Sequence, residues 1–295
     1  MENKQPMHSR ELGLVLGKQL LDVEDLHYGF WTDDLPLSLA NLSKAQQQYS
    51  DRLLAMLPPT PDPDTGEIVR VLDIGCGTGH ILVQLLDRGY EVDGVIPAPA
   101  LVAAVRERLK EKPGNATMLY NCNFENLDQN QIEKKYDVAL YSESFQYIPM
   151  RESFEKLKQI VKPGGRVVIC DFFKTAADGD GAPGDGSFRG GHPMTEFYKL
   201  LEDQPFEISS DEDITKNVGP NLALVNDLLI NRIMPAGQTI GQYLQDNYPK
   251  TSWIVSKLFK KKFSKWKYKY FSGHRNQWVF ERYKTYHHIV LRLKD

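Results

Sequence analysis

Cysteine is scarce in this chain, and long apolar runs are absent. Only Cys76, Cys122 and Cys170 occur among 295 residues, with no C-x-x-C pair. So sparse and odd a set argues against a disulfide framework and a zinc site, and indicates reduced thiols in a cytoplasm. No apolar run approaches the ~20 residues of a membrane span, and the polar N-terminus lacks a signal-peptide core. We therefore expect a globular, cytoplasmic protein without a bound metal.

Positive charge is outnumbered by negative charge except near the end of the chain. The formal net charge is −3, yet residues 257–295 carry twelve Lys or Arg against two acids. The segment 256–271 reads as a basic amphipathic helix, which fits either a lid packed on the domain or contact with a membrane surface or lipid. Nucleic acid is the weaker alternative, because the rest of the chain is acidic. Four aromatic residues recur here at helical spacing: Phe259, Phe263, Trp266 and Tyr270.

The most informative stretch is VLDIGCGTGH, residues 71–80. Apolar residues give way to three glycines at alternate positions, and an apolar helical pattern follows at once. This pattern predicts a buried strand, a tight turn and a helix start. Glycine permits positive φ and close approach of a ligand, at which a helix N-terminus points its N–H groups. The spacing differs from the G-x-G-x-x-G of dinucleotide sites, and no Lys-Ser/Thr pair follows, as a P-loop requires.

Strands alternate with helices after this turn, which predicts an α/β fold with a doubly wound parallel sheet. We expect Lys162–Gly165 to be a turn, and the Gly- and Asp-rich loop 177–191 to hold too little apolar content to pack. A mostly helical insertion follows from residue 214 to 283. The expected strands are 70–74, 90–96, 117–121, 137–142, 166–171, 206–210 and 286–293, and the expected helices are 41–57, 99–110, 150–161 and 194–201.

The glycine turn resembles the first motif of the class I S-adenosylmethionine-dependent methyltransferases. The branch that it resembles methylates small molecules such as tocopherols, sarcosine, natural-product sugars and lipid chains. The resemblance implies a seven-stranded Rossmann-like sheet with N-terminal helices and a helical insertion before the antiparallel last strand. It also implies S-adenosyl-L-methionine as the cofactor. Further stretches that match the family are His27–Trp31, Gly94–Pro99, Tyr136–Ser144, Val161–Ile169 and Asp171–Phe173.

The same resemblance divides the chain into four parts. Residues 1–60 would be an N-terminal helical cap, 61–215 the cofactor-binding core, 216–283 a helical substrate lid, and 284–295 the last strand of the sheet.

Two of the cofactor positions depart from the family. Ile96 stands where many members have an acid that accepts both ribose hydroxyls. Asn123 stands where an acid receives the adenine amine, and its side-chain oxygen can still accept that bond. Phe124 could stack on adenine or pack in the core. The cofactor contacts that the resemblance implies are Asp73, Gly75, Gly77, Gly79, Ile96, Asn123, Phe124 and Ser142.

The general base is less obvious. Sugar-methylating relatives carry a His after their Glu-Ser pair, but Glu143-Ser144 is followed here by Phe145-Gln146-Tyr147. A hydroxyl acceptor needs a base, whereas methylation at carbon needs one only after transfer. The candidates are Asp171, Glu143, His27 and His192, each weighed against a capping, cofactor-positioning or loop role. Acceptor contacts are expected from Tyr28, Trp31, Gln146, Tyr147 and His274.

The expected function is therefore S-adenosylmethionine-dependent O- or C-methylation of a small, largely apolar metabolite of natural-product, lipid or isoprenoid type. The alternatives are N-methylation, and a methyltransferase-like protein that binds the cofactor without transferring a methyl group.

Overall fold

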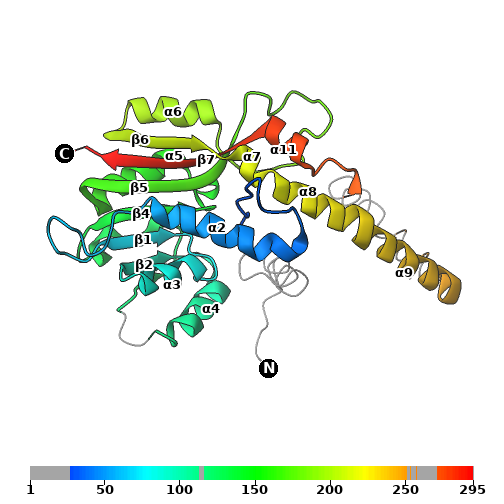
Figure 1. Cartoon of the computed structure of the whole chain (residues 1–295), viewed down its shortest axis with the longest axis horizontal. Coiled ribbons are helices and arrows are strands. Elements are labelled where there is room, and N and C mark those ends of the chain that lie inside the picture. The colour runs from blue at the N-terminus through cyan, green and yellow to red at the C-terminus, as the bar shows by residue number, and fades with distance from the viewer. Residues whose placement is uncertain (1–26, 113–115, 251–252, 254–256, 258–270, 295) are drawn as a thin grey trace.

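A seven-stranded sheet runs through the computed structural model, which describes residues 27–112, 116–250, 253, 257 and 271–294 (Figure 1). The strand order is β3-β2-β1-β4-β5-β7-β6, and every pairing is parallel except those of β7 with β5 and β6. The predicted Rossmann-like sheet with an antiparallel last strand is therefore confirmed. The strands are β1 (Arg70–Ile74), β2 (Glu91–Val95), β3 (Leu119–Tyr120), β4 (Tyr136–Ser142), β5 (Val161–Lys174), β6 (Phe206–Asp213) and β7 (Lys284–Leu293).

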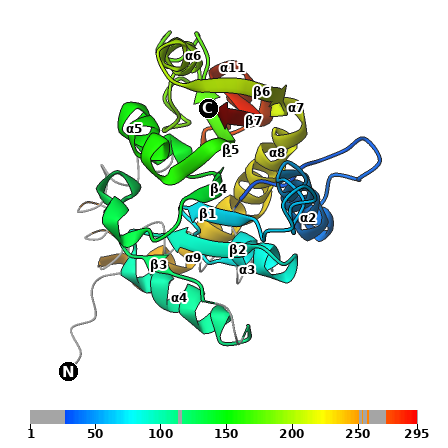
Figure 2. The same ribbon diagram turned by 90° about the vertical axis from the view of Figure 1, so that its left-hand side faces the viewer.

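Helices cover both faces of the sheet because alternate strand residues point to opposite sides. One face, with Val71 and Val168, packs on α2 (Leu42–Ala55), α3 (His80–Asp87), α4 (Pro99–Leu109) and α11 (Gln277–Tyr283). The other, with Leu72 and Val167, packs on α5 (Met150–Ile160) and α6 (Met194–Glu202). Figure 2 shows α5 and α6 on the side of the sheet opposite α2.

Two local expectations were wrong. The predicted turn at Lys162–Gly165 lies inside β5, which begins at Val161 and has a register shift there against β4. The loop 177–191 does pack, because Phe188 is buried and its ring lies edge-on to Phe280 at 5.3 Å. The composition of the loop did not predict this packing, because one aromatic residue, Phe188, is enough to anchor the loop.

The part ahead of the sheet is less helical than expected. Residues 27–38 form no helix, and a 3-10 turn at Leu39–Asn41 (η1) leads directly into α2. Of the predicted cap, residues 1–26 lie outside the described part of the chain. Asn221 fastens the segment to α8, accepting from the Gly29 N–H at 2.9 Å and donating to its carbonyl at 2.6 Å.

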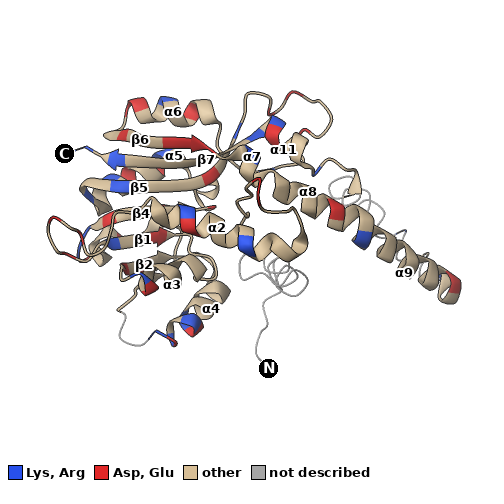
Figure 3. Cartoon of the chain, in the orientation of Figure 1, with Lys and Arg blue, Asp and Glu red and all other residues tan. Residues whose placement is uncertain are grey.

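The insertion is helical, as expected, in its described residues. It contains α7 (Thr215–Val218), α8 (Pro220–Asp227), a π-helical turn η5 (Leu228–Ile233) and α9 (Met234–Asn247). Figure 1 shows α8 and α9 as an arm that leaves the sheet, and Figure 3 shows few charged residues along it. The predicted basic helix at 256–271 lies outside the described residues, apart from Lys257 and Phe271.

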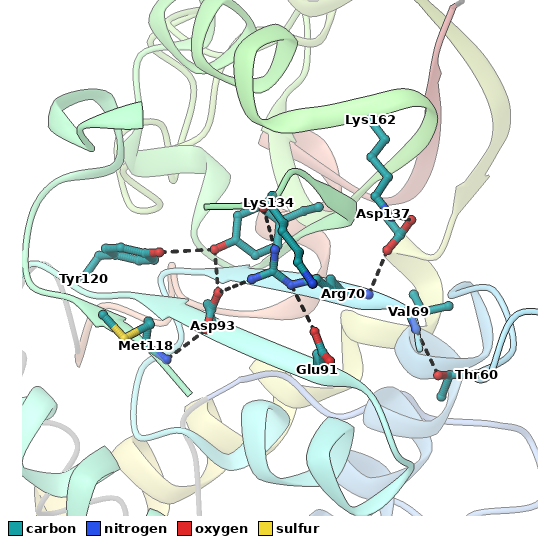
Figure 4. Close-up of polar contacts among 11 residues, drawn as sticks. Thr60, Val69, Arg70, Glu91, Asp93, Met118, Tyr120, Lys134, Asp137 and Lys162 are labelled. Carbon is teal, nitrogen blue, oxygen red and sulfur yellow. Dashed lines mark hydrogen bonds and ion pairs between the residues drawn. The ribbon is translucent and has the colours of Figure 1, made fainter. Parts of the chain in front are cut away.

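A polar network fixes the strands at their amino ends (Figure 4). The Arg70 guanidinium lies 3.2 Å from both Asp93 and Glu91. The buried Asp93 carboxylate also accepts from the Tyr136 hydroxyl at 2.6 Å and from the Met118 N–H at 2.8 Å. These bonds join β1, β2 and β4 at the end remote from the glycine turn, so Asp93 has a structural role.

Candidate functional site

The glycine turn lies at the carboxyl end of β1, where β1 neighbours both β2 and β4. Chain order reverses between these neighbours, which is where open α/β sheets bind ligands. Gly75, Gly77 and Gly79 have φ values of 81°, 54° and 82°, and α3 begins at His80. This is the predicted strand, turn and helix start.

The three glycines have different surroundings. A Cβ on Gly75 would lie 2.5 Å from the Ser144 Cβ, and one on Gly79 would lie 3.0 Å from Val105. Within the part of the chain that the structure describes, a Cβ on Gly77 would meet only the Gly75 carbonyl oxygen, at 4.0 Å. Packing therefore requires Gly75 and Gly79, whereas Gly77 faces open space that a ligand can use.

The other predicted cofactor residues do not all reach the surface. Asp73 and Ile96 are each 1% exposed, and the Ile96 side chain packs in the core. The Phe124 ring is 2% exposed and lies edge-on to Tyr141 at 5.9 Å, which favours core packing over adenine stacking. Asn123 is exposed, and Ser142 lies beside the Tyr49 hydroxyl.

Glu143 follows the carboxyl end of β4 and is held from two sides. Its Oε1 accepts from the Tyr28 N–H at 2.8 Å and from the Tyr286 hydroxyl at 3.1 Å. Among the described residues it is the one non-glycine residue with positive φ, at 54°. A strained backbone of this kind persists only where its surroundings enforce it, and it is typical of functional sites.

Asp171 lies near the end of β5 and is fully buried. Its carboxylate accepts from the Gln146 N–H at 2.9 Å, the Gln146 side chain at 3.0 Å and the Phe172 N–H at 2.8 Å. Burial raises the pKa of Asp171 to about 7, although these hydrogen bonds act to lower it. The group is therefore poised near neutrality, but its oxygens face protein donors.

The two candidate histidines also have structural partners. The His192 Nε2 lies 3.0 Å from the Phe145 carbonyl oxygen and 2.9 Å from that of Ile148, so this nitrogen donates. The His27 Nδ1 donates to the Tyr28 carbonyl at 2.8 Å, and the His27 ring stacks on Tyr49 at 4.9 Å. In each histidine the engaged nitrogen cannot accept a proton.

Three of the predicted acceptor residues, Tyr28, Gln146 and Tyr147, lie near Glu143 and Asp171. The charges acting on the Tyr28 hydroxyl come from Glu143, Arg275, Tyr147 and Asp171, which places these groups around it. Burial, followed by the Glu143 carboxylate, raises the pKa of Tyr28. Tyr147 is 58% exposed, and half-buried Gln146 bonds Asp171.

Trp31 does not belong to this cluster. Its side chain is 4% exposed and packs in a small cluster with Leu35 and Ala45. His274 is half-buried and lies just before the Asn276 cap of α11.

Two residues of the site were missed from the sequence. The Phe280 ring lies 6.0 Å from Tyr28 and 6.3 Å from Phe172, and the Tyr286 ring lies 6.0 Å from Tyr28. Phe280 belongs to an insertion without a readable motif, and Tyr286 is one of several aromatic residues near the last strand. No sequence signal distinguished either residue.

Within the described ranges, no three His, Cys, Asp or Glu side chains come together as a metal site would need. Nor is any helix in those ranges both long and apolar enough to cross a bilayer.

Comparison with known proteins agrees with this architecture. A family model described as a methyltransferase domain matches residues 72–167. The sterol 4-C-methyltransferase strm-1 of Caenorhabditis elegans is 30% identical over 116 residues, 38% of this chain and 34% of that protein. The chloroplastic tocopherol O-methyltransferase of Arabidopsis thaliana is 26% identical over 153 residues, 50% of this chain and 43% of that protein. The chain thus spans less than half the length of these curated relatives.

The fold extends the likeness over nearly the whole chain. The geranyl diphosphate C-methyltransferase of Streptomyces coelicolor A3(2), solved with Mg2+, geranyl diphosphate and S-adenosyl-L-homocysteine, superposes with a TM-score of 0.64 at 17% identity. The match covers 94% of this chain and 92% of that one. Residues 72–167 therefore match a methyltransferase domain, and the chain has the fold of S-adenosylmethionine-dependent methyltransferases.

Proposed function

We propose that the protein transfers a methyl group from S-adenosylmethionine to a small, largely apolar acceptor. The open space at Gly77, at the carboxyl end of β1, is the observation that carries this proposal. The methyltransferase domain over residues 72–167 supports it.

The residues around the turn fit this cofactor in part. The backbone of Gly75, Gly77 and Gly79 would hold its amino acid and ribose, and the exposed Asn123 would accept from the adenine amine. No acid stands at Ile96, so one pair of charge-assisted hydrogen bonds is absent. We expect binding that depends strongly on the glycine turn.

Bound S-adenosylmethionine would supply a methyl group on a sulfonium. Transfer would break the carbon–sulfur bond, leave its electron pair on sulfur and form the bond to the acceptor, whose proton would pass to a base on the protein. Holding the two groups in line provides most of the catalysis in such a transfer. The aromatic rings of Tyr28, Phe172 and Phe280 would contact an apolar acceptor and exclude water.

Glu143 is the best placed of the four candidate bases. It is half-buried at the end of β4, beside the Tyr28 hydroxyl, whereas Asp171 is fully enclosed by donors. We assign proton removal to Glu143, and to Asp171 the orientation of Gln146. His27 and His192 are assigned positioning roles through the carbonyl groups that they bond.

The buried Ile96 favours one alternative, a protein that binds the cofactor without turnover. Turnover distinguishes the two. An enzyme releases S-adenosylhomocysteine when incubated with S-adenosylmethionine and a crude metabolite extract, whereas a binding protein does not. Product analysis of the methylated compound would then separate O-, C- and N-methylation.

The first test is calorimetric titration with S-adenosylmethionine. We expect binding by the natural protein and none by Gly77→Arg, because the new side chain would fill the open space. Gly66→Arg is the matched control, since Gly66 also has a positive φ, 73°, and nothing within 4 Å of an added Cβ. Absence of binding by the natural protein would overturn the proposal.

We also infer that segment 256–271 meets an anionic lipid surface. Its lysines and aromatic residues support this, and each lysine near such a surface adds about 1 kcal/mol. Replacing Lys260, Lys261 and Lys262 by Glu should weaken sedimentation with phosphatidylglycerol vesicles at least tenfold. The same change at exposed Lys134, Lys135 and Lys199 should not. Equal losses in both variants would refute the lipid contact.

A further inference from the structure

The Tyr286 hydroxyl links the last strand of the sheet to the candidate base. It donates to Glu143 Oε1 at 3.1 Å and lies 2.8 Å from the Tyr49 hydroxyl of α2. A phenol has one proton, so if Tyr286 donates to Glu143, Tyr49 must donate to Tyr286. The result is a directed chain of hydrogen bonds from α2 through β7 to the carboxylate.

This chain is buried and stays protonated. Tyr49 and Tyr286 are each 0% exposed. Burial raises the pKa of both phenols well above the ordinary value, so both remain hydrogen-bond donors at neutral pH. Their rings meet edge-on at 6.2 Å, which fixes the direction of both hydroxyls.

Glu143 needs such support. Its backbone is in the left-handed region, at φ 54°, a strained conformation that persists only where surrounding contacts enforce it. The same Oε1 also accepts from the Tyr28 N–H at 2.8 Å, so it joins the N-terminal segment to β4. Two donors on one oxygen fix the carboxylate plane and therefore the position of the other oxygen.

We propose that Tyr286, supported by Tyr49, is a positioning residue that aims the Glu143 carboxylate at the acceptor and fastens Tyr28 beside it. This inference rests on the proposed methyl transfer, in which Glu143 removes the acceptor's proton. It assigns a function to the last strand and to α2, neither of which carries a predicted catalytic residue. Tyr286 acts through Glu143 and does not touch the reacting atoms.

Hydrogen exchange at the Tyr28 amide measures the arrangement without any acceptor. That amide donates to Glu143, whereas the neighbouring Phe30 amide donates to the Ala45 carbonyl and serves as an internal control. Tyr286→Phe should speed exchange at Tyr28 about fivefold, the effect of one hydrogen bond, and leave Phe30 unchanged. Tyr141→Phe, which loses a buried hydroxyl bond to Ser153, is the matched control and should change neither.

A double-mutant cycle tests whether Tyr286 acts through Glu143. Glu143→Gln alone should speed exchange at Tyr28, and adding Tyr286→Phe to it should change exchange less than twofold.

Two results would overturn the proposal: equal acceleration of exchange at Tyr28 and Phe30, or an undiminished effect of Tyr286→Phe in the Glu143→Gln background. Calorimetry with S-adenosylmethionine on the same preparations keeps the outcomes separate. If the cofactor binds but the exchange result fails, the role of Tyr286 is refuted and the proposed function stands. If the exchange result holds but the cofactor does not bind, the proposed function fails instead.

Discussion

Gln146 donates both its backbone N–H and its side-chain amide to the carboxylate of Asp171, at 2.9 and 3.0 Å. The pair joins the turn after β4 to the end of β5. Gly190 lies beside it, since a Cβ added to Gly190 would lie 2.7 Å from the Gln146 Oε1. Since Asp171 is fully buried, its charge state affects stability directly.

Asp171 should make stability fall as pH rises. Its pKa is about 7 in the folded protein and near its ordinary value of 3.8 when unfolded, so the folded state binds the extra proton between these values. The stabilisation of the folded protein by this proton is complete below about pH 4 and is lost by about pH 7, a change of roughly 4 kcal/mol in the free energy of unfolding. Asp171→Asn, which stays neutral, should gain stability relative to the natural protein over this range.

Urea unfolding between pH 5 and 8 measures this difference. Buried His288 acts in the opposite direction, because burial lowers its pKa to about 3 and its contribution is lost as pH falls below about 6.5. His288 is present in both proteins, so the difference between them isolates Asp171. Parallel stability curves would show that Asp171 does not titrate in this range.

Asn221 should govern how firmly the N-terminal segment is held. This buried side chain bonds the N–H and carbonyl of Gly29 and also the Val218 carbonyl, at 2.7 Å. Asn221→Ala leaves these groups without partners, and we expect a loss of about 2–3 kcal/mol in the free energy of unfolding. Exposed Asn231→Ala on η5 is the control and should change stability by less than about 0.5 kcal/mol. Similar losses from the two changes would show that the hydrogen bonds of Asn221 do not hold the N-terminal segment.

The network at the amino ends of the strands should matter for stability and not for cofactor binding. Tyr136→Phe removes the hydroxyl that donates to Asp93 at 2.6 Å, leaving a buried carboxylate with one donor fewer. We expect a loss of about 1–3 kcal/mol in urea unfolding, because hydrogen bonds to charged groups are the stronger ones. Calorimetric affinity for S-adenosylmethionine should remain within twofold. A weakened affinity would show coupling across the sheet.

The sequence was sufficient where local pattern and burial coincide. The bounds of β1 match the expected strand at 70–74, because its apolar run ends at the first glycine. Glu143 was recognised from its place after β4, but not its bond to Tyr286, which lies 143 positions away in the chain. Contacts of that separation depend on the register of β7 against β5, which no local pattern encodes.

Trp31 illustrates what a local pattern leaves open. An aromatic residue near a matching motif suggested an acceptor contact, but its burial at 4% exposure depends on its packing with Leu35 and Ala45. Phe124 is similar, since either stacking on a ligand or core packing fits its pattern, and only the position of Tyr141 favours the core. Apolar residues near a site therefore need tertiary packing to be interpreted.

Gly75 and Gly77 separate the folding role of the turn from its binding role. Both have positive φ, so replacement by Ala strains the backbone at either position by about 1 kcal/mol. At Gly75 the new Cβ would also lie 2.5 Å from the Ser144 Cβ, whereas at Gly77 it would face open space. Gly75→Ala should therefore lower stability by about 2–4 kcal/mol, and Gly77→Ala by about 1 kcal/mol.

Gly77→Ala should affect cofactor affinity more than it affects stability. Gly77→Ala places its methyl group where the cofactor would approach the backbone, so we expect at least tenfold weaker binding of S-adenosylmethionine in a protein that unfolds nearly as the natural one does. Calorimetry and urea unfolding on the same samples make the comparison. Unchanged affinity in Gly77→Ala would mean that any ligand of this turn lies elsewhere, because among the described residues only the Gly75 carbonyl oxygen comes within 4 Å of the added group, at that limit.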